Sequence, residues 1–173
     1  MTISKATLDD VAKLTALVNT AYRGKESMKG WATEAHILDG QRVDQDMMTD
    51  YLNDANATIL KYTNDGNEIE ACVYLEKKDH KLYLGMLSVL PHLQAKGIGR
   101  QLLEASEKLA LEINCDTMVM TVISSRQQLI EWYERRGYNF TGEVQPFHAD
   151  TRFGVPKVPI ELVVMEKGVL ERL

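Results

Sequence analysis

The feature that most constrains the fold is a strand, loop, helix and strand in direct succession between residues 81 and 123. Residues 82–90 are almost all apolar, as in a central strand that is covered on both faces. Apolar residues then recur at helical spacing from Ile98 to Ile113, and residues 117–123 are apolar and rich in β-branched side chains. Such a βαβ unit joins two parallel strands by a right-handed crossover. We therefore expect a parallel pair of strands in the middle of the sheet.

Elements on either side of this unit complete an α+β fold. The predicted elements are, in chain order, helices at 8–22, 44–52 and 126–136, an antiparallel hairpin of strands 57–62 and 69–76, and strands at 138–144 and 160–166. Thr7 can cap the first helix, and Gly137 is a typical residue just after the last one. Residues 33–38 are predicted to form one or two helical turns. The resulting mixed sheet is antiparallel at first, parallel in the middle and flanked by helices.

Composition restricts the class of protein. With 173 residues, 45% of them hydrophobic and 26% charged, the chain fits one domain over residues 1–173. The net charge of −5 lacks the basic footprint of a nucleic-acid binder and gives a weak preference for a cationic partner. No apolar run of about 18 residues and no signal-peptide pattern occurs, so we expect a cytoplasmic protein without membrane partners. The oligomeric state stays open, with a homodimer as one option.

The two cysteines do not predict a special site. Cys72 and Cys115 stand in apolar surroundings without a C-x-x-C motif or a histidine at ligand spacing. We interpret both as buried thiols and expect no disulfide framework. No cluster of His, Cys or carboxylate residues has ligand spacing, so we expect no metal site.

The loop between the first strand and the helix of the βαβ unit is a candidate anion-binding site. Its residues are Gln94, Ala95, Lys96, Gly97, Ile98, Gly99 and Arg100. Glycines let a ligand approach the backbone, and the first N–H groups of a helix have no internal acceptor and can point at phosphate oxygens. Lys96 and Arg100 add positive charge. The plain alternative is that the glycines only permit a tight turn.

Two other phosphate-binding motifs fit this loop poorly. A dinucleotide fingerprint needs a third glycine at position 102, where this chain has Leu102. A P-loop needs Gly-Lys followed by Ser or Thr, and the sequence Gly99-Arg100-Gln101 does not supply it.

A second motif, Glu131-Trp132-Tyr133-Glu134-Arg135-Arg136-Gly137-Tyr138, closes the helix after the next strand. Together with the pattern Pro91-x-x-Gln94-x-x-Gly97-x-Gly99 upstream of Leu102-Leu103, it resembles the GNAT superfamily of N-acetyltransferases. The motifs cover about residues 82–140, and the predicted elements on either side fit the layout of the family. The resemblance implies that acetyl-CoA binds where two central parallel strands splay apart.

The resemblance also implies roles for particular residues on the cofactor side. The loop from Gln94 to Arg100 would hold the pyrophosphate through backbone N–H groups, and the strand edge from Leu87 to Val89 would pair with the pantetheine arm. The backbone N–H of Val89 would polarise the thioester carbonyl. Arg126 stands where many relatives have asparagine, so it either contacts the cofactor or solvates the start of the helix.

Tyr133 is the implied general acid. A phenol with a pKa of about 10 stays protonated at neutral pH and can donate to a departing thiolate. The alternative is that Tyr133 packs in the core and only positions the thioester.

The general base is less constrained by sequence. Glu34 and His36 lie in the irregular segment 31–42, which corresponds by position to the variable acceptor-binding region of the family. A carboxylate there can deprotonate an ammonium substrate, although a solvated loop is the simpler interpretation. Weaker candidates are Glu70, Tyr74 and His80.

Arginines and aromatic residues are further candidates on the acceptor side. Arg23 and Arg42 either pair with a carboxylate of the acceptor or lie at the surface. Trp31, Phe147 and Phe153 either line an acceptor pocket or cap the core.

The leading functional prediction is acetyl transfer from acetyl-CoA to a primary amine of a small molecule or amino acid. One alternative is a CoA-binding sensor or interaction module with little catalysis, against which Tyr133 and the intact loop argue. The other is transfer to the amino group of a protein or peptide.

Overall fold

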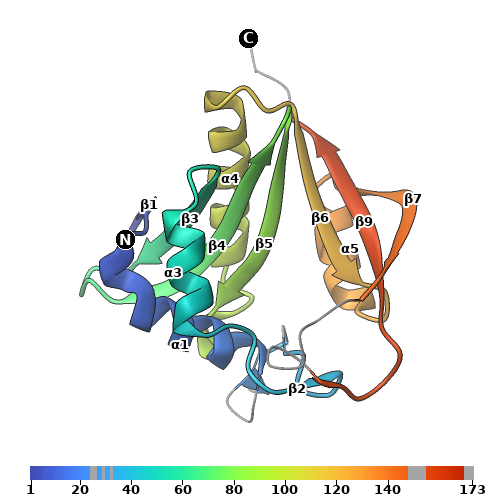
Figure 1. The fold of residues 1–173 in the computed structure, drawn as a ribbon, viewed down its shortest axis with the longest axis horizontal. Helices are drawn as coiled ribbons and strands as arrows, with labels where there is room; N and C mark the ends of the chain where they lie inside the picture. Colours follow the sequence, from blue (N-terminus) through green and yellow to red (C-terminus); the bar gives the residue numbers. More distant parts are fainter. Residues whose placement is uncertain (24–26, 29, 32, 148–154, 170–173) are drawn as a thin grey trace.

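A computed structural model describes residues 1–23, 27–28, 30–31, 33–147 and 155–169 of the chain. At its centre lies a seven-stranded sheet in the order β1-β3-β4-β5-β6-β9-β7 (Figure 1). Its strands are β1 (Thr2–Lys5), β3 (Ala57–Thr63), β4 (Ile69–Lys78), β5 (Lys81–Val89), β6 (Thr117–Ile123), β7 (Asn139–Pro146) and β9 (Glu161–Gly168). A second, two-stranded sheet pairs β2 (Leu38–Asp39) with β8 (Val155–Pro156).

Helices pack on both faces of the large sheet (Figure 1). They are α1 (Val11–Tyr22), which continues the 3-10 turn η1 (Leu8–Asp10), α3 (Gln45–Asn53), α4 (Ile98–Glu112) and α5 (Gln127–Glu134). The side chains of Ile59 and Cys72 point into a core under α1 and α3, whereas Leu60 and Val73 belong to a second core with α4 and α5. Alternating side chains along the strands thus supply two cores, one on each face.

The central strand β5 contains a bulge. Met86 has a φ of 51°, and the register with β4 shifts beside it. Leu82 and Leu84 point into the core under α4, but Met86 points into the core under α1 and α3. An extra residue in one strand reverses the alternation beyond it. Leu87 and Val89 therefore pack at the rim of the α4 core.

β5 and β6 are parallel, but they pair only over residues 81–83 and 117–119. Beyond this short ladder the two strands diverge, and Figure 1 shows the gap widening toward their carboxyl ends. β6 is paired instead along its whole length with β9. Within the described chain, residues 84–89 of β5 therefore have no strand partner on the side of β6.

The predicted fold class is confirmed, including the hairpin, the parallel pair and the helix and strand types along the chain. Thr7 begins the first helical segment as expected, and its backbone N–H donates to Asp10 Oδ2 over 2.9 Å. Cys72 and Cys115 are free and buried, as predicted. No helix in the described part of the chain has the length and apolar character needed to cross a bilayer.

Some features of the sheet were not predicted. The strands β1, β2 and β8 were missed, and β9 inserts between β6 and β7 although it follows β7 in the chain. Residues 33–38 were expected to form one or two helical turns, and a single turn is present, because the Glu34 carbonyl accepts from the N–H groups of Ile37 and Leu38 over 2.9 Å each. This turn leads directly into β2. β2 and β8 are two residues long, so neither leaves a periodic pattern in the sequence.

Candidate active site

The loop before α4 has a conformation that leaves its backbone accessible. Gly97 lies at the helix N-cap with a φ of 87°, and Ala95 also has a positive φ of 65°. A Cβ atom added to Gly97 would meet nothing within 4 Å. The side chain of Gln94 anchors the loop to β5, because its Nε2 donates to the Val89 carbonyl over 2.9 Å. The first N–H groups of α4 have no acceptor within the helix, and the space beside Gly97 at its start is open.

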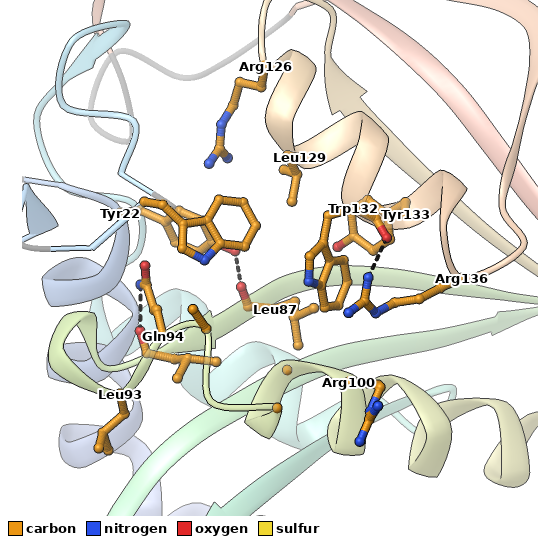
Figure 2. Close-up of a pocket in the computed structure, with 15 residues that line it drawn as sticks. Tyr22, Leu87, Leu93, Gln94, Arg100, Arg126, Leu129, Trp132, Tyr133 and Arg136 are labelled. Carbon is orange, nitrogen blue, oxygen red and sulfur yellow. Dashed lines mark hydrogen bonds between the residues drawn. The ribbon is translucent and has the colours of Figure 1, made fainter.

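The edge of β5 that faces the gap is marked by two hydrogen bonds from side chains. The Tyr22 hydroxyl donates to the Leu87 carbonyl, and Gln94 Nε2 donates to the Val89 carbonyl (Figure 2). Within an extended strand, the N–H and C=O groups of one residue point to the same edge. The N–H groups of Leu87 and Val89 thus also face the gap rather than β4.

A first cavity of about 700 Å³ of empty space extends from this edge to the start of α4 (Figure 2). It is lined by Tyr22, Trp31, Leu87, Val89, Leu93, Gln94, Ala95, Gly97, Gly99, Arg100, Arg126, Leu129, Trp132, Tyr133 and Arg136. Within the described part of the chain, its charged lining residues are the arginines at 100, 126 and 136. The lining is therefore more basic than the chain as a whole, which has a net charge of −5.

Arg136 and Trp132 form one wall of this cavity. The Arg136 guanidinium stacks 3.8 Å from the centre of the Trp132 ring, and its Nη1 donates to the Trp132 carbonyl over 2.8 Å. Among the described residues, Arg136 Nε is a buried side-chain atom without a hydrogen-bond partner. Burial lowers the pKa of Arg136, and so do the nearby positive charges of Arg135 and Arg100. An anion in the cavity would supply both a partner and a compensating charge.

Tyr133 lies on α5 and is buried between two aromatic side chains. Its ring makes edge-to-face contacts with Trp132 and Tyr138, with centroids 5.0 Å and 5.7 Å apart. Burial raises the pKa of the Tyr133 hydroxyl, and the neighbouring Tyr22 acts in the same direction, while Arg126 opposes it. Tyr133 therefore stays protonated at neutral and moderately alkaline pH.

A second cavity, of about 1310 Å³ of empty space, lies in the gap between β5 and β6. Residues 84–87 of β5 and 120–123 of β6 form two of its walls, together with Phe147 and the arginines Arg23 and Arg42. The two cavities share Tyr22, Leu87, Arg126, Leu129 and Tyr133. Molecules bound in the two cavities would therefore meet beside the Tyr133 side chain.

The expectation of a solvated loop around Glu34 was wrong. Glu34 is buried, and its Oε1 accepts from Arg23 Nη2 and Nε over 3.2 Å and 3.3 Å. Its Oε2 accepts from Arg126 Nη1 over 3.4 Å. Glu34 thus links the end of α1 to the start of α5, two elements that are far apart in the sequence. Arg23 is buried as well, so it is not the surface arginine that was the simpler expectation. Arg126 is also buried, which argues against the alternative that it solvates the start of α5.

Some of the remaining predicted site residues line one of the two cavities, and others do not. Lys96 is exposed and Ile98 is buried in the core, and neither lines the first cavity. His36, which was considered with Glu34 as a candidate base, lines neither cavity, and the same holds for the weaker candidates Glu70, Tyr74 and His80. Trp31 lines the first cavity and Phe147 the second, whereas Phe153 lies outside the described residues.

Sequence reasoning missed Tyr22 and Arg136 as site residues. Tyr22 was assigned only to the apolar face of the first helix, and Arg136 was one of two adjacent arginines in the second motif. A polar tip on a helical apolar stripe and an arginine four residues after a tryptophan are weak signals, which become informative only when neighbouring elements are known. The described residues contain no group of three or more His, Cys, Asp or Glu that could hold a metal ion.

Comparison with known proteins identifies the family. The sequence profile of the acetyltransferase (GNAT) family matches residues 17–138. The chain belongs to this family. The family and the N-acetyltransferase class that the sequence predicted are therefore confirmed.

Solved structures of GNAT acetyltransferases have the same fold over nearly the whole chain. The ribosomal-protein-S18-alanine N-acetyltransferase from Escherichia coli is 16% identical with a TM-score of 0.73, covering 99% of this chain and 96% of that one. An N-acetyltransferase from Staphylococcus aureus Mu50 is 16% identical with a TM-score of 0.74, covering 97% of each chain. The ribosomal-protein-alanine N-acetyltransferase from Brucella melitensis is 20% identical with a TM-score of 0.73, covering 97% of this chain and 99% of that one.

Proposed function

We propose that this GNAT protein transfers the acetyl group of acetyl-CoA directly to a primary amine of a small molecule or amino acid. The observation that carries the proposal is the meeting of two cavities at Tyr22, Leu87, Arg126, Leu129 and Tyr133. The charged residues that the structure places in the lining of one cavity are arginines, and the other cavity opens into the gap between β5 and β6. Two substrates can then approach one another without either leaving the protein. All these parts belong to one N-acetyltransferase domain over residues 1–173.

The first cavity fits a phosphate-bearing thioester cofactor. The open space at Gly97, the unpaired N–H groups at the start of α4 and the partnerless Arg136 Nε all suit anionic oxygens. Arg100 adds positive charge at the mouth of the cavity, where its guanidinium is largely exposed. Gln94 holds the loop before α4 through its hydrogen bond to Val89. Lys96 contributes to cofactor binding at most through its charge, and Ile98 supports the loop through core packing. When bound, acetyl-CoA supplies the acetyl thioester.

The edge of β5 orients the amide-bearing arm of the cofactor. The N–H groups of Leu87 and Val89 point into the gap, and each carbonyl keeps a second lone pair beside the one used by Tyr22 or Gln94. The N–H of Val89 polarises the acetyl carbonyl, because a fixed donor in a dry cleft needs no reorganisation.

Tyr133 donates the proton that the departing sulfur needs. As the nitrogen–carbon bond forms and the carbon–sulfur bond breaks, the hydroxyl proton passes to the thiolate. The proton that the amine loses leaves to solvent, and solvent returns one proton to the Tyr133 phenolate. Its buried hydroxyl stays protonated, so the donor form is present at working pH.

Glu34 was the sequence-derived candidate for the general base, and we assign it instead to positioning. Both of its carboxylate oxygens accept hydrogen bonds from arginines, one from Arg23 and the other from Arg126. A carboxylate that is held in this way fixes the walls of the second cavity. The amine then reaches the junction already neutral or loses its proton to water.

The experiment is a screen for thiol release from acetyl-CoA, with acetylated products identified by mass spectrometry. The acceptors are small primary amines, amino acids and a peptide with an N-terminal alanine, since two similar structures are ribosomal-protein-alanine N-acetyltransferases. We expect amine-dependent turnover above the rate of hydrolysis with at least one small acceptor. Tight CoA binding with no turnover would favour a CoA-binding module, and acetylation of the peptide alone would favour a peptide acetyltransferase.

A further inference from the structure

The charges around the second cavity are unlike those of the chain as a whole. Among the residues that the structure describes, its charged lining residues are Arg23, Arg42, Arg126 and Glu34, which are three guanidinium groups and one carboxylate. The chain has 25 acidic and 20 basic residues and a net charge of −5. The lining of this cavity thus carries a positive excess in an acidic protein.

Two of the three arginines hold the segment between α1 and α3 in place. Arg23 donates to Glu34 and also, through Nη1, to the carbonyls of Gly40 and Gln41 over 3.4 Å and 3.3 Å. Arg126 holds the other oxygen of Glu34. These contacts hold residues 34–41, which include the lining residues Glu34 and Leu38 of the second cavity.

Arg42 adds the charge that Glu34 does not balance. Its backbone N–H donates to Asn19 Oδ1 over 2.6 Å, which fixes this residue beside α1, and its side chain is half-buried in the cavity lining. Burial and the charge of Glu34 raise the pKa of Tyr22 to about 12, whereas Arg126 and Arg42 act in the lowering direction. Arg42 therefore lies close enough to influence the junction of the two cavities.

The geometry points to an acceptor that carries a carboxylate besides its primary amine, with Arg42 as the residue that binds the carboxylate. This inference rests on the proposed acetyl transfer and names the class of acceptor. The planar guanidinium matches a carboxylate with two parallel hydrogen bonds. With the carboxylate at Arg42, the amine end extends toward Tyr133 at the junction.

The positive excess also explains why the amine can react without a protein base. Nearby positive charges favour the neutral form of an amine, which is the nucleophilic form. A carboxylate on the same molecule offsets the repulsion that a simple ammonium ion would meet on entering. The overall acidic charge of the chain acts at long range and is screened beyond about 10 Å at 0.1 M salt, so it does not decide what binds inside the cavity.

The test compares each of the twenty L-amino acids with its own carboxamide in the acetyl-CoA thiol-release assay. Both members of a pair carry the α-amine on the same carbon skeleton, and only the acid has the carboxylate. Because that carboxylate raises the pKa of the α-ammonium group, rates are compared per neutral amine. We expect at least one amino acid to have a kcat/KM about ten- to a hundredfold above that of its carboxamide, which is the effect of a charge-assisted hydrogen bond.

Variants of Arg42 identify the binding residue. Arg42→Gln should raise the KM for the preferred amino acid about tenfold or more, and should lower the kcat/KM for that acid about tenfold more than the kcat/KM for its carboxamide. Arg42→Lys should restore part of the preference, because it keeps the charge and loses the planar fork. Arg135→Gln is the matched control, since Arg135 is exposed and lines neither cavity.

The possible failures are distinguishable. Carboxamides that are acetylated as well as or better than the acids would overturn the inference and leave acetyl transfer standing. Equal loss with acid and amide in Arg42→Gln would overturn the role of Arg42. If CoA binds and no amine of any kind is acetylated, the proposed function itself fails and the inference fails with it.

Discussion

At the residue scale, the chemistry depends on side chains that are buried and yet line a cavity. Tyr133 packs against Trp132 and Tyr138 and still contributes to both cavities. Burial raises the pKa of its hydroxyl, so Tyr133 remains a proton donor throughout the pH range in which the protein would work. The same packing holds the Tyr133 ring in place, which suits the proposed donation of a proton to the cofactor sulfur.

Tyr133→Phe should lower kcat about a hundredfold, the usual contribution of a general acid, and leave the affinity for CoA within about twofold. Because the Tyr133 hydroxyl does not ionise between pH 6 and 9, the ratio of wild-type to variant rates should be constant over that range. Steady-state kinetics at several pH values and CoA titration measure both effects. Tyr138→Phe is the matched control, since Tyr138 is equally buried and lines neither cavity. Unchanged turnover in Tyr133→Phe would remove it as the acid.

Gly97 tests the cofactor loop in a similar way. Gly97→Ala should weaken CoA binding about tenfold, because the new methyl group enters the space where the pyrophosphate is proposed to lie. The positive φ of 87° should also cost about 1–2 kcal/mol in the free energy of unfolding. Gly142→Ala is the control, because Gly142 has a φ of 91° and equally open surroundings but lies on β7. Equal CoA affinity in the two variants would refute the proposed location of the pyrophosphate.

At the element scale, two irregularities shape the site. The bulge at Met86 turns the end of β5, so that Leu87 and Val89 pack at the rim of the α4 core and line the first cavity. The segment between α1 and α3 is held by Glu34, whose contacts reach Arg23 and Arg126. Neither the bulge nor the Glu34 contacts belong to a regular helix or strand pattern. The Glu34 contacts also connect parts of the chain that are distant in sequence.

Glu34→Gln separates a positioning role from that of a base. The substitution should lower the free energy of unfolding by about 1.5–3 kcal/mol and raise the acceptor KM, because two buried arginines lose their anionic partner. The shape of the pH–rate profile should not change. Urea unfolding and rate profiles from pH 5 to 9 measure these effects, with the exposed Glu131→Gln as control. Loss of the acidic limb of the profile, together with a large fall in kcat and unchanged stability, would instead identify Glu34 as the base.

At the scale of the whole molecule, a divergent sheet creates the site. β5 and β6 pair for three residues at one end and then separate, while β4 and β9 hold their outer edges. The two helices that carry the motifs, α4 and α5, share one core on the same face of the sheet. The loop before α4 and Tyr133 on α5 are thereby brought to opposite sides of a single cavity.

The buried tyrosines also make global stability depend on pH. Burial and Glu34 raise the pKa of Tyr22 to about 12 in the folded state, whereas an exposed tyrosine in the unfolded chain ionises near 10. Below pH 10 both states are protonated and the contribution of Tyr22 is fully present; above pH 10 the unfolded chain loses its proton first and stability falls. Tyr22 should contribute a loss of about 1.4 kcal/mol per pH unit between pH 10 and 12.

Urea unfolding at pH 8, 9, 10 and 11 measures this slope. Tyr22→Phe should reduce the alkaline slope by that amount, whatever its effect on stability at neutral pH. The same slope in the variant and the wild type would show that Tyr22 does not retain its proton in the folded state.

Much of the fold was predictable because its elements depend on local sequence patterns. The apolar period of α4, the continuous apolar run of β5 and the capped start at Thr7 depend on neighbours within a few residues, and all three were predicted. The open turn before α4 was predictable for the same reason, since Gly97 adopts its positive φ through its own backbone. Glu34 was selected from its place in a variable segment, but the expectation of solvent around it was wrong.

The sequence alone therefore determined the longer elements, the mixed sheet and the loop from Gln94 to Arg100, because periodicity, turn residues and helix-start chemistry are local properties. The family followed from the resemblance of two motifs. Only the tertiary structure decided that β9 lies between β6 and β7, that Arg136 stacks on Trp132 beside the loop, and that Glu34 lies between Arg23 and Arg126. The physical reason is that burial and pairing of charges depend on which distant segments share a face. For the same reason, the positive excess of the second cavity could not be inferred from a chain whose net charge is −5.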